Sequence, residues 1–238
     1  MNDPTNTCQH CNQASIEGLE PKTQNGLAYA VRYCDRCEEY LDRWPDEDPR
    51  PERKILRWKM PAAFLETDPT RLHQKQLKEA LKWAPGKKGL LLAGITRAGK
   101  TRTMMELVKR QLGYGRNVTY WPAVELCKKL SDSHTRKGEH AELMHKLKRC
   151  RILYIDDLGK EKLTANVEAC LFDIIRDRCD WHRPLLITTN FSAMQLAGRF
   201  TEPETSIPMV ERLQEYCQIV TFAERIPEEQ PAQDELAI

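Results

Sequence analysis

The sequence predicts an α/β fold in which helices cover both faces of a parallel sheet, preceded by a small cysteine-containing module. Between residues 89 and 222, five short apolar runs alternate with segments of helical periodicity. A glycine-rich loop follows the first of these runs directly. Continuous apolar strands separated by helices are typical of a parallel sheet that is buried on both faces.

The N-terminal module is predicted from Cys8, Cys11, Cys34 and Cys37, which form two C-x2-C pairs. Each pair closes a tight knuckle that presents two thiolates, and two knuckles together suit a tetrahedral Zn²⁺ ion. Four thiolates leave no open position, so we expect a structural metal that lets residues 1–43 fold around a minimal core.

The regions that follow differ sharply in composition. Residues 44–57 are charged and rich in proline, which predicts an extended, exposed linker. Residues 58–223 carry the alternating pattern, with a helix expected over 72–83 before the first strand. Residues 224–238 are rich in proline, glutamate and glutamine and are expected to form a disordered acidic tail.

The five apolar runs are the expected strands of the sheet, and amphipathic segments between them are the expected helices. The runs are residues 89–93, 118–121, 152–155, 184–188 and 219–222. One of these helices is expected directly after the glycine-rich loop, with Gly113 as its C-cap, and another near residues 163–180.

Composition limits the class of protein without choosing a partner. The 238 residues suffice for one α/β domain and a small appendage, and a hydrophobic content of 40% with 30% charged residues predicts a soluble globular protein. The formal net charge of +2 argues neither for nor against nucleic acid. Because the chain has no long apolar run and no signal-peptide pattern, we expect a cytoplasmic protein without a membrane partner.

The loop GITRAGKT matches the phosphate-binding pattern G-x-x-x-x-G-K-[ST], and it has the required strand before it and helix after it. Gly94 and Gly99 allow the backbone to turn its N–H groups toward phosphates. Lys100 is expected to reach the outer phosphates and Thr101 to offer its hydroxyl to Mg²⁺. The predicted nucleotide contacts are Gly94, Ile95, Thr96, Arg97, Ala98, Gly99, Lys100, Thr101 and Arg102.

Acidic and polar residues follow two other expected strands. Asp156 and Asp157 come directly after the run 152–155, and ligands of open parallel sheets bind beyond that edge. We expect Asp156 to hold Mg²⁺ and Asp157 to orient and deprotonate an attacking water. A solvated strand end is the alternative for both acids. Asn190 ends the motif ITTN, where contact with the outermost phosphate and an ordinary polar turn are equally good interpretations.

The ordered motifs GITRAGKT, YIDDLG, LITTN and PMVERL resemble those of the AAA+ ATPases of helicase loaders of the DnaC/DnaI type, including phage members. Relatives of these loaders are the IstB-like ATP-binding helpers of IS21-type transposons. The resemblance covers residues 58–223 and implies a P-loop AAA+ sheet without a full helical lid. It also implies ATP and an origin that leans to phage. Slow turnover is expected because the second acid is Asp157, where many AAA+ proteins have glutamate.

The resemblance assigns a role to each catalytic candidate. Lys100 and Thr101 resemble the Walker A pair, and Asp156 and Asp157 resemble the Walker B acids. Asn190 resembles sensor 1, and Arg212 resembles the arginine finger that reaches the ATP of a neighbouring subunit. Without the resemblance, Arg212 is interpreted as a surface arginine. A finger used in this way requires a homo-oligomer.

The partners implied are a hexameric replicative helicase, contacted by residues 1–43, and single-stranded DNA, contacted by residues 128–151. The basic residues of the second region are Lys128, Lys129, Arg136, Lys137, Lys146, Lys148, Arg149 and Arg151. Basic side chains follow the phosphate backbone of single strands, although a solvated helical face is the alternative. DNA contact by the zinc module is a further alternative.

Three functions compete with a helicase loader whose ATPase is stimulated by DNA or a partner. The first is a transposition helper with the same ATP-binding domain. The second is a P-loop nucleoside kinase, since such enzymes also combine a phosphate loop with a four-cysteine zinc site. The third is an adaptor that binds ATP without hydrolysing it. The cofactors expected for the loader are ATP, Mg²⁺ and Zn²⁺.

Overall fold

The computed structural model describes residues 22–24, 27–29 and 62–226, apart from residues 87, 115, 135, 137 and 161–163. The chain divides into two compact units, one of Met1–Met60 with Leu112–Gly115 and one of Pro61–Gln111 with Arg116–Ile238. The predicted linker and the four predicted zinc ligands, Cys8, Cys11, Cys34 and Cys37, lie outside the described residues.

The described part of the first unit includes a small antiparallel hairpin. Strand β1 (Lys22–Gln24) pairs with β2 (Leu27–Tyr29), with Lys22 opposite Tyr29 and Gln24 opposite Leu27. Asn-Gly, the dipeptide between the strands in the sequence, favours two-residue hairpin connections. The hairpin falls in the sequence between the two predicted cysteine pairs.

The second unit is built on a five-stranded sheet with the order β4-β5-β6-β3-β7, in which every neighbouring pair is parallel. The strands are β3 (Gly89–Gly94), β4 (Val118–Pro122), β5 (Ile152–Leu158), β6 (Leu185–Thr189) and β7 (Cys217–Phe222). The expected parallel α/β sheet is therefore confirmed, and β3, which leads into the phosphate loop, lies between β6 and β7.

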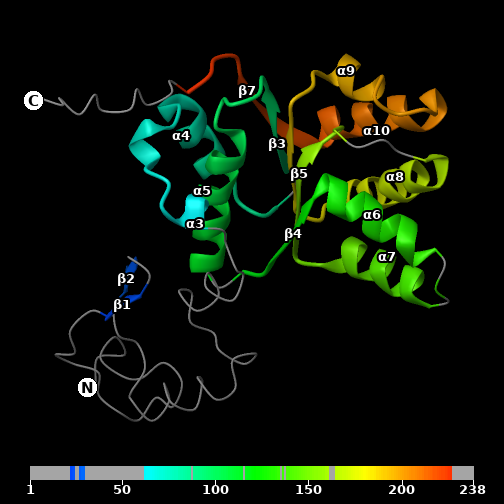
Figure 1. Ribbon diagram of the computed structural model, residues 1–238, viewed down its shortest axis with the longest axis horizontal. Coiled ribbons are helices and arrows are strands. Elements are labelled where there is room, and N and C mark those ends of the chain that lie inside the picture. Colours follow the sequence, from blue (N-terminus) through cyan, green and yellow to red (C-terminus); the bar gives the residue numbers. More distant parts are fainter. Residues whose placement is uncertain are drawn as a thin grey trace, which may run out of the picture. The chain divides into compact units, whose positions relative to one another are not determined.

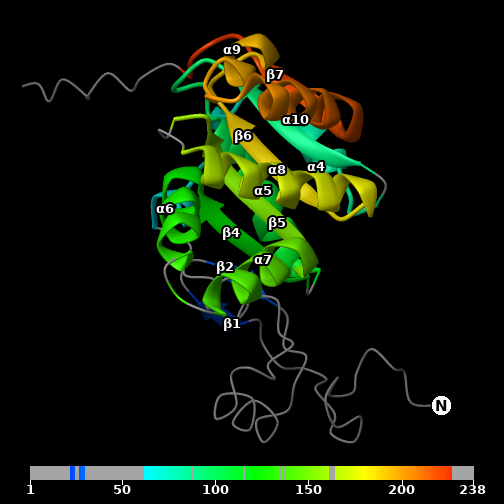
Figure 2. The same cartoon turned by 90° about the vertical axis from the view of Figure 1, so that its right-hand side faces the viewer.

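Helices cover both faces of this sheet. Figure 1 shows on one face α3 (Ala62–Leu65), α4 (Gln74–Lys82) and α5 (Lys100–Gly113). Figure 2 shows on the other face α6 (Ala123–Ser133), α7 (Glu139–Arg149), α8 (Ala165–Asp180) and α10 (Pro203–Tyr216). Two short elements complete the fold, the 3-10 helix η2 (Pro69–Arg71) and α9 (Ala193–Ala197). None of the helices in the described residues is long and apolar enough to cross a bilayer.

The strand β5 extends further than the sequence predicts. The apolar run suggests an end at Ile155, but the strand continues through both acids to Leu158. Its pairing with β6 shifts between Ile155 and Leu158, and Asp157 adopts a positive φ of 65°. The acids therefore occupy an irregular strand end, where the backbone leaves the regular ladder and can redirect their side chains.

Residues 224–226, where the acidic tail is predicted to begin, still contact the folded domain. The N–H of Ile226 donates to the carbonyl oxygen of Arg97 at 3.1 Å. The ring Nε2 of His73 lies 3.0 Å from the carbonyl oxygen of Glu224. Residues 224–226 therefore pack against the domain through His73 and Arg97, while residues 227–238, the rest of the predicted tail, lie outside the described chain.

Candidate nucleotide-binding site

The phosphate loop connects the end of β3 to the start of α5, and its two glycines are required by geometry. Gly94 has a φ of 144°, and a Cβ there would lie 2.0 Å from the carbonyl oxygen of Phe222. Gly99 has a φ of 79°, and a Cβ there would lie 2.4 Å from Cδ1 of Ile226. At Gly94 the main chain of Phe222 leaves no room for a side chain, and at Gly99 the positive φ is the obstacle, since the tip of Ile226 could move. The tight loop opens directly into the N-terminus of α5, where anions are favoured.

The other residues of the loop occupy different environments. Thr96 and Arg97 are exposed and line the cavity described below, while Ala98 is fully buried beneath it. Ile95 is exposed, and its N–H donates to the carbonyl oxygen of Phe222 at 3.1 Å. The guanidinium of Arg102 donates to the carbonyl oxygen of Ala63 at 2.7 Å, so it links α5 to the segment that begins the domain.

Lys100 places its ammonium group inside the site although its side chain is largely buried. Its Nζ donates to the carbonyl oxygen of Ile95 at 2.6 Å and to Oδ1 of Asn190 at 2.7 Å. Burial lowers the pKa of Lys100, while the charges of Asp157 and Asp156 act in the opposite direction. The ammonium therefore lies where the motif requires a phosphate-binding cation. It is held there by two polar contacts that the oxygens of a bound phosphate could replace.

Asp156 is buried and accepts hydrogen bonds from four hydroxyl groups, three at Oδ1 and that of Tyr120 at Oδ2, 3.5 Å away. Its Oδ1 lies 3.0 Å from Oγ1 of Thr101, 2.7 Å from the Tyr154 hydroxyl and 2.5 Å from Oγ1 of Thr188. Burial and the charge of Asp156 raise the pKa of Tyr154, which keeps that phenol protonated and able to donate. Mg²⁺ prefers oxygen ligands, and the Asp156 carboxylate and the Thr101 hydroxyl supply two that face each other. These residues therefore fit the predicted metal.

Asp157 belongs to a second polar group that connects three strands. Its main-chain N–H donates to Oγ1 of Thr188 at 2.8 Å, and its carboxylate accepts from Nδ2 of Asn190 and pairs with Lys160. Asn190 therefore contacts both Lys100 and Asp157, with its oxygen toward the cation and its nitrogen toward the anion. The carboxyl ends of β3, β5 and β6 are neighbours in the sheet, which brings these residues together.

A cavity of 720 Å³ lies over the phosphate loop, within the size range of nucleotide and cofactor sites. Besides the predicted residues, it is lined by Phe64, Glu66, Thr67, Asp68, Arg71, Leu72, Lys160 and Ile226. These eight residues belong to no motif, so the sequence analysis missed them. Some of these residues are apolar and others polar, and they come from the beginning and the end of the domain. The apolar ones could contact the base of a nucleotide, and the polar ones its sugar, beside the phosphate loop.

Arg212 lies away from this cavity. It is on α10, and its Nη1 is 2.5 Å from Oδ1 of Asp180 at the end of α8. The strand that follows α10 begins at Cys217, which pairs with Gly89, whereas the phosphate loop follows Gly94 at the opposite end of β3. Arg212 therefore lies near the amino ends of the strands, opposite the phosphate loop. It is not placed to act on a nucleotide bound by its own chain.

The predicted basic region forms the paired helices α6 and α7. Arg136 pairs with Glu139 at 3.4 Å and Lys148 pairs with Asp173 at 2.5 Å. Lys137 lies outside the described residues. Besides Arg136, the exposed basic residues of this region are Lys128, Lys129, Lys146, Arg149 and Arg151.

The fold and the site together define a P-loop nucleotide-binding protein of the AAA+ type. The glycine cradle, the buried ammonium of Lys100 and the pair formed by Thr101 and Asp156 fit a nucleotide with its Mg²⁺. The chain belongs to the family of IstB-like ATP binding proteins, whose model matches residues 51–226. The expected resemblance is thus confirmed, while the zinc module and the phage origin stay predictions.

Individual relatives support the same assignment. The chain is 24% identical over 134 residues to Rv3427c, an ATP-binding protein in an insertion sequence of Mycobacterium tuberculosis; the match covers 56% of this chain and 53% of the relative. The chain therefore spans about half the length of that relative. Its fold is similar to the crystal structure of DnaI (24% identity, TM-score 0.57, 69% of this chain and 95% of that chain). It is also similar to the DnaC helicase loader (21% identity, TM-score 0.53, 62% and 86%).

Proposed function

We propose that this protein is an ATP-dependent switch that loads a hexameric replicative helicase onto single-stranded DNA. The observation that supports it best is the position of Asn190, which contacts Lys100 on one side and Asp157 on the other. A phosphate bound by Lys100 would compete for one of these contacts, and the change would pass to the acid of β5. ATP would thus favour one assembly and its hydrolysis would favour release.

The same contacts account for a slow ATPase. Asp157 is the group we propose to orient the attacking water. Its carboxylate is oriented by Asn190 but is also paired with the ammonium of Lys160. A carboxylate engaged in this way is poorly available as a base, and its arm is shorter than that of glutamate. We therefore propose that DNA or the partner accelerates hydrolysis by releasing Asp157 from Lys160, while Asn190 keeps the carboxylate oriented.

Arg212 completes the site of a neighbouring subunit in this proposal. Its place near the amino ends of the strands excludes action within its own chain and favours action in a homo-oligomer. A mixing experiment tests this role. Arg212→Ala and Lys100→Ala should each lack ATPase activity alone, whereas their mixture should regain part of it, because one chain supplies the loop and the other the guanidinium.

Asp180→Ala is the matched control for this experiment. It removes the same ion pair but keeps the guanidinium of Arg212, so activity should persist. Normal turnover by Arg212→Ala, or a mixture as inactive as its components, would remove Arg212 from the reaction.

The partner contacts are proposed from charge and from likeness of fold. The exposed basic residues of α6 and α7 would follow the phosphates of single-stranded DNA, and residues 1–43 would bind the helicase around a structural Zn²⁺. The similarity to the DnaC helicase loader supports this choice.

Native mass spectrometry of the full chain with the replicative helicase of its host and ATP tests the loader directly. We expect a complex of defined stoichiometry that is lost in Lys100→Ala. A helicase that forms no complex with the wild-type chain, under conditions in which the chain binds ATP, would contradict the proposal.

A transposition helper is the second candidate, because the family is IstB-like and one relative lies in an insertion sequence. Such a helper would assemble with ATP on DNA in the absence of any helicase. Assembly on duplex DNA, combined with no helicase complex, would favour it. The nucleoside-kinase alternative gains no support from this family, and a test for nucleoside phosphorylation checks it cheaply.

A further inference from the structure

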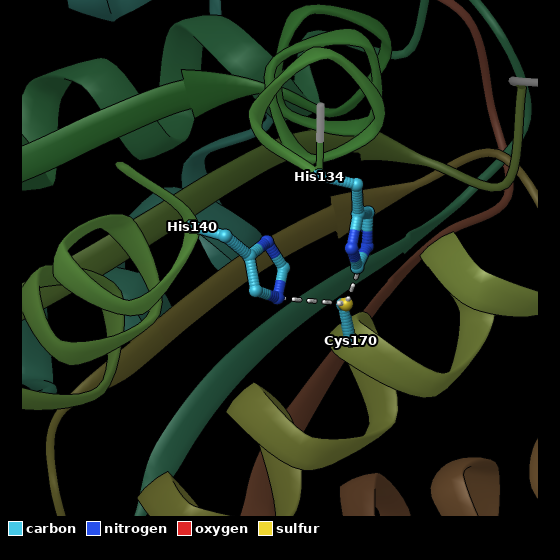
Figure 3. A group of neighbouring side chains, drawn as sticks. All are labelled: His134, His140 and Cys170. Carbon is cyan, nitrogen blue, oxygen red and sulfur yellow. Dashed lines mark hydrogen bonds between the residues drawn. The ribbon is translucent and has the colours of Figure 1, made fainter. Parts of the chain in front are cut away.

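Two histidines and a cysteine that belong to no sequence motif meet between α6, α7 and α8 (Figure 3). His134 follows the last residue of α6, His140 is in the first turn of α7, and Cys170 lies on α8. Sγ of Cys170 is 3.5 Å from Nε2 of His134 and 3.8 Å from Nε2 of His140. Three ligand atoms from three elements thus converge on one point, well separated in the sequence from the phosphate loop.

We propose that His134, His140 and Cys170 form a Zn²⁺ site. In a tetrahedral site with Zn–N of about 2.0–2.1 Å and Zn–S of about 2.3 Å, sulfur and nitrogen ligands are about 3.6 Å apart. The two sulfur–nitrogen distances here bracket that value. The three ligand atoms all lie within 4.8 Å of one another. The two imidazole rings are stacked with their centroids 3.9 Å apart, so one ring must rotate before both Nε2 lone pairs face a single ion.

Ser133 prepares His140 for this role. The Ser133 hydroxyl donates its single hydrogen to the carbonyl oxygen of Leu130 at 2.7 Å, and it lies 2.9 Å from Nδ1 of His140. Its oxygen must therefore accept from Nδ1–H. That hydrogen bond fixes the tautomer of His140 so that the lone pair of Nε2 faces Cys170, an outer-shell arrangement that is usual for metal-binding histidines.

The ligand set favours Zn²⁺ over harder ions. Two imidazoles and one thiolate suit a borderline-soft ion, whereas Mg²⁺ and Ca²⁺ require oxygen ligands. Binding releases the proton of the Cys170 thiol to solvent, and a water completes the tetrahedron from the side of the exposed His134. The ion would fasten the turn between α6 and α7 to α8, the helix that follows the Walker B strand in the chain.

The primary test measures the zinc content of the full-length protein by elemental analysis, after saturation with Zn²⁺ and gel filtration. His134→Ala is the first variant because His134 is exposed and its loss leaves the core intact. Wild type should hold one more equivalent of zinc than His134→Ala or Cys170→Ser, whatever the N-terminal cysteines bind. His145→Ala, an exposed histidine of α7, and Cys179→Ser, a buried cysteine of α8, should match wild type.

Affinity gives a second measurement. Ser133→Ala keeps all three ligands but removes the acceptor for Nδ1–H, so the affinity for Zn²⁺ should fall by about 10- to 100-fold in competition with a chromophoric chelator. Equal zinc content in wild type, His134→Ala and Cys170→Ser would overturn the proposal, and the three side chains would then be packed against one another only. A loss of zinc in both control variants would overturn it as well.

Discussion

The two ends of the parallel strands hold buried cations in very different surroundings. At the carboxyl end, Lys100 contacts one main-chain carbonyl and the side chain of Asn190, and the cavity lies beside it. At the amino end, Arg178 is fully buried on α8. Its guanidinium donates to main-chain oxygens at the end of α7 and before β6, namely those of Leu147, Lys148, Cys150 and Pro184.

The difference in their contacts indicates that the charge of Arg178 is structural and that the charge of Lys100 is available for ligand binding. Main-chain carbonyls cannot leave Arg178 without loss of the fold, so this charge holds the chain crossing between α7, α8 and β6 together. The contacts of Lys100 come from a loop and a side chain, and a phosphate can replace them. Substitutions at the two positions should therefore affect different quantities, stability at one end and ligand affinity at the other.

The largest effect is expected for Arg178→Ala, which leaves several buried carbonyl groups unpaired and creates a cavity. The free energy of unfolding should fall by about 3–5 kcal/mol in urea denaturation. Arg176→Ala on the same helix is the control. Arg176 is partly exposed and pairs with Asp173, so its loss should cost less than about 1 kcal/mol. Similar values for both variants would refute the structural role of Arg178.

Lys100→Ala should weaken ATP binding by about 100-fold in isothermal titration, since a charge-assisted hydrogen bond contributes about 1.5–3 kcal/mol. Its unfolding free energy should stay within about 1 kcal/mol of wild type, because the variant also removes a cation from a desolvated position. Lys160→Ala changes another lysine of the cavity, one whose side chain is 48% exposed. If this control lost as much affinity, Lys100 would have no special place in the site.

Asn190→Ala separates hydrolysis from binding. The affinity for ATP should change by less than about threefold, whereas turnover should fall roughly tenfold, because Asp157 loses the amide that orients it. Asn190→Asp keeps an oxygen toward Lys100 but removes the N–H donor to Asp157, so it should bind ATP and turn over slowly as well. A loss of affinity comparable with that of Lys100→Ala would show that Asn190 contributes to binding instead.

The smallest effect is expected for Ile226→Ala, which removes an apolar side chain from the wall of the cavity. Partial loss of its burial against a nucleotide should weaken ATP binding by about three- to fivefold, roughly 1 kcal/mol. Ile219→Ala truncates an isoleucine of β7 that is 42% exposed and does not line the cavity. An unchanged affinity in Ile226→Ala would place the nucleotide away from residues 224–226.

The parts of the site that follow strands could be predicted from the sequence. Asp156 and Asn190 come just after apolar runs and Lys100 ends the loop that follows another, and parallel strands bring their carboxyl ends together. The spacing of the motif also indicates the close turns at Gly94 and Gly99, which the structure requires. The positions of five strands could be predicted within a few residues because each is a continuous apolar segment.

Features that depend on packing between distant segments could not be predicted. Ile226 reaches the phosphate loop only because β7 lies beside β3, and its composition places it in an acidic tail. His134, His140 and Cys170 match no ligand spacing, since a turn between helices and a separate helix bring them together. The continuation of β5 through Asp156 also has no local signal, because aspartate is uncommon in strands.

The position of β3 between β6 and β7 has a consequence for how the protein is made. Its partners on either side, β6 and β7, include Leu186 and Gln218, which pair with Leu90 but follow it far along the chain. A ribosome adds about 5–20 residues per second, so β3 waits several seconds for its neighbours. The phosphate loop follows the first strand of this sheet to be translated, yet the sheet around it is complete only when β7, its last strand, has emerged.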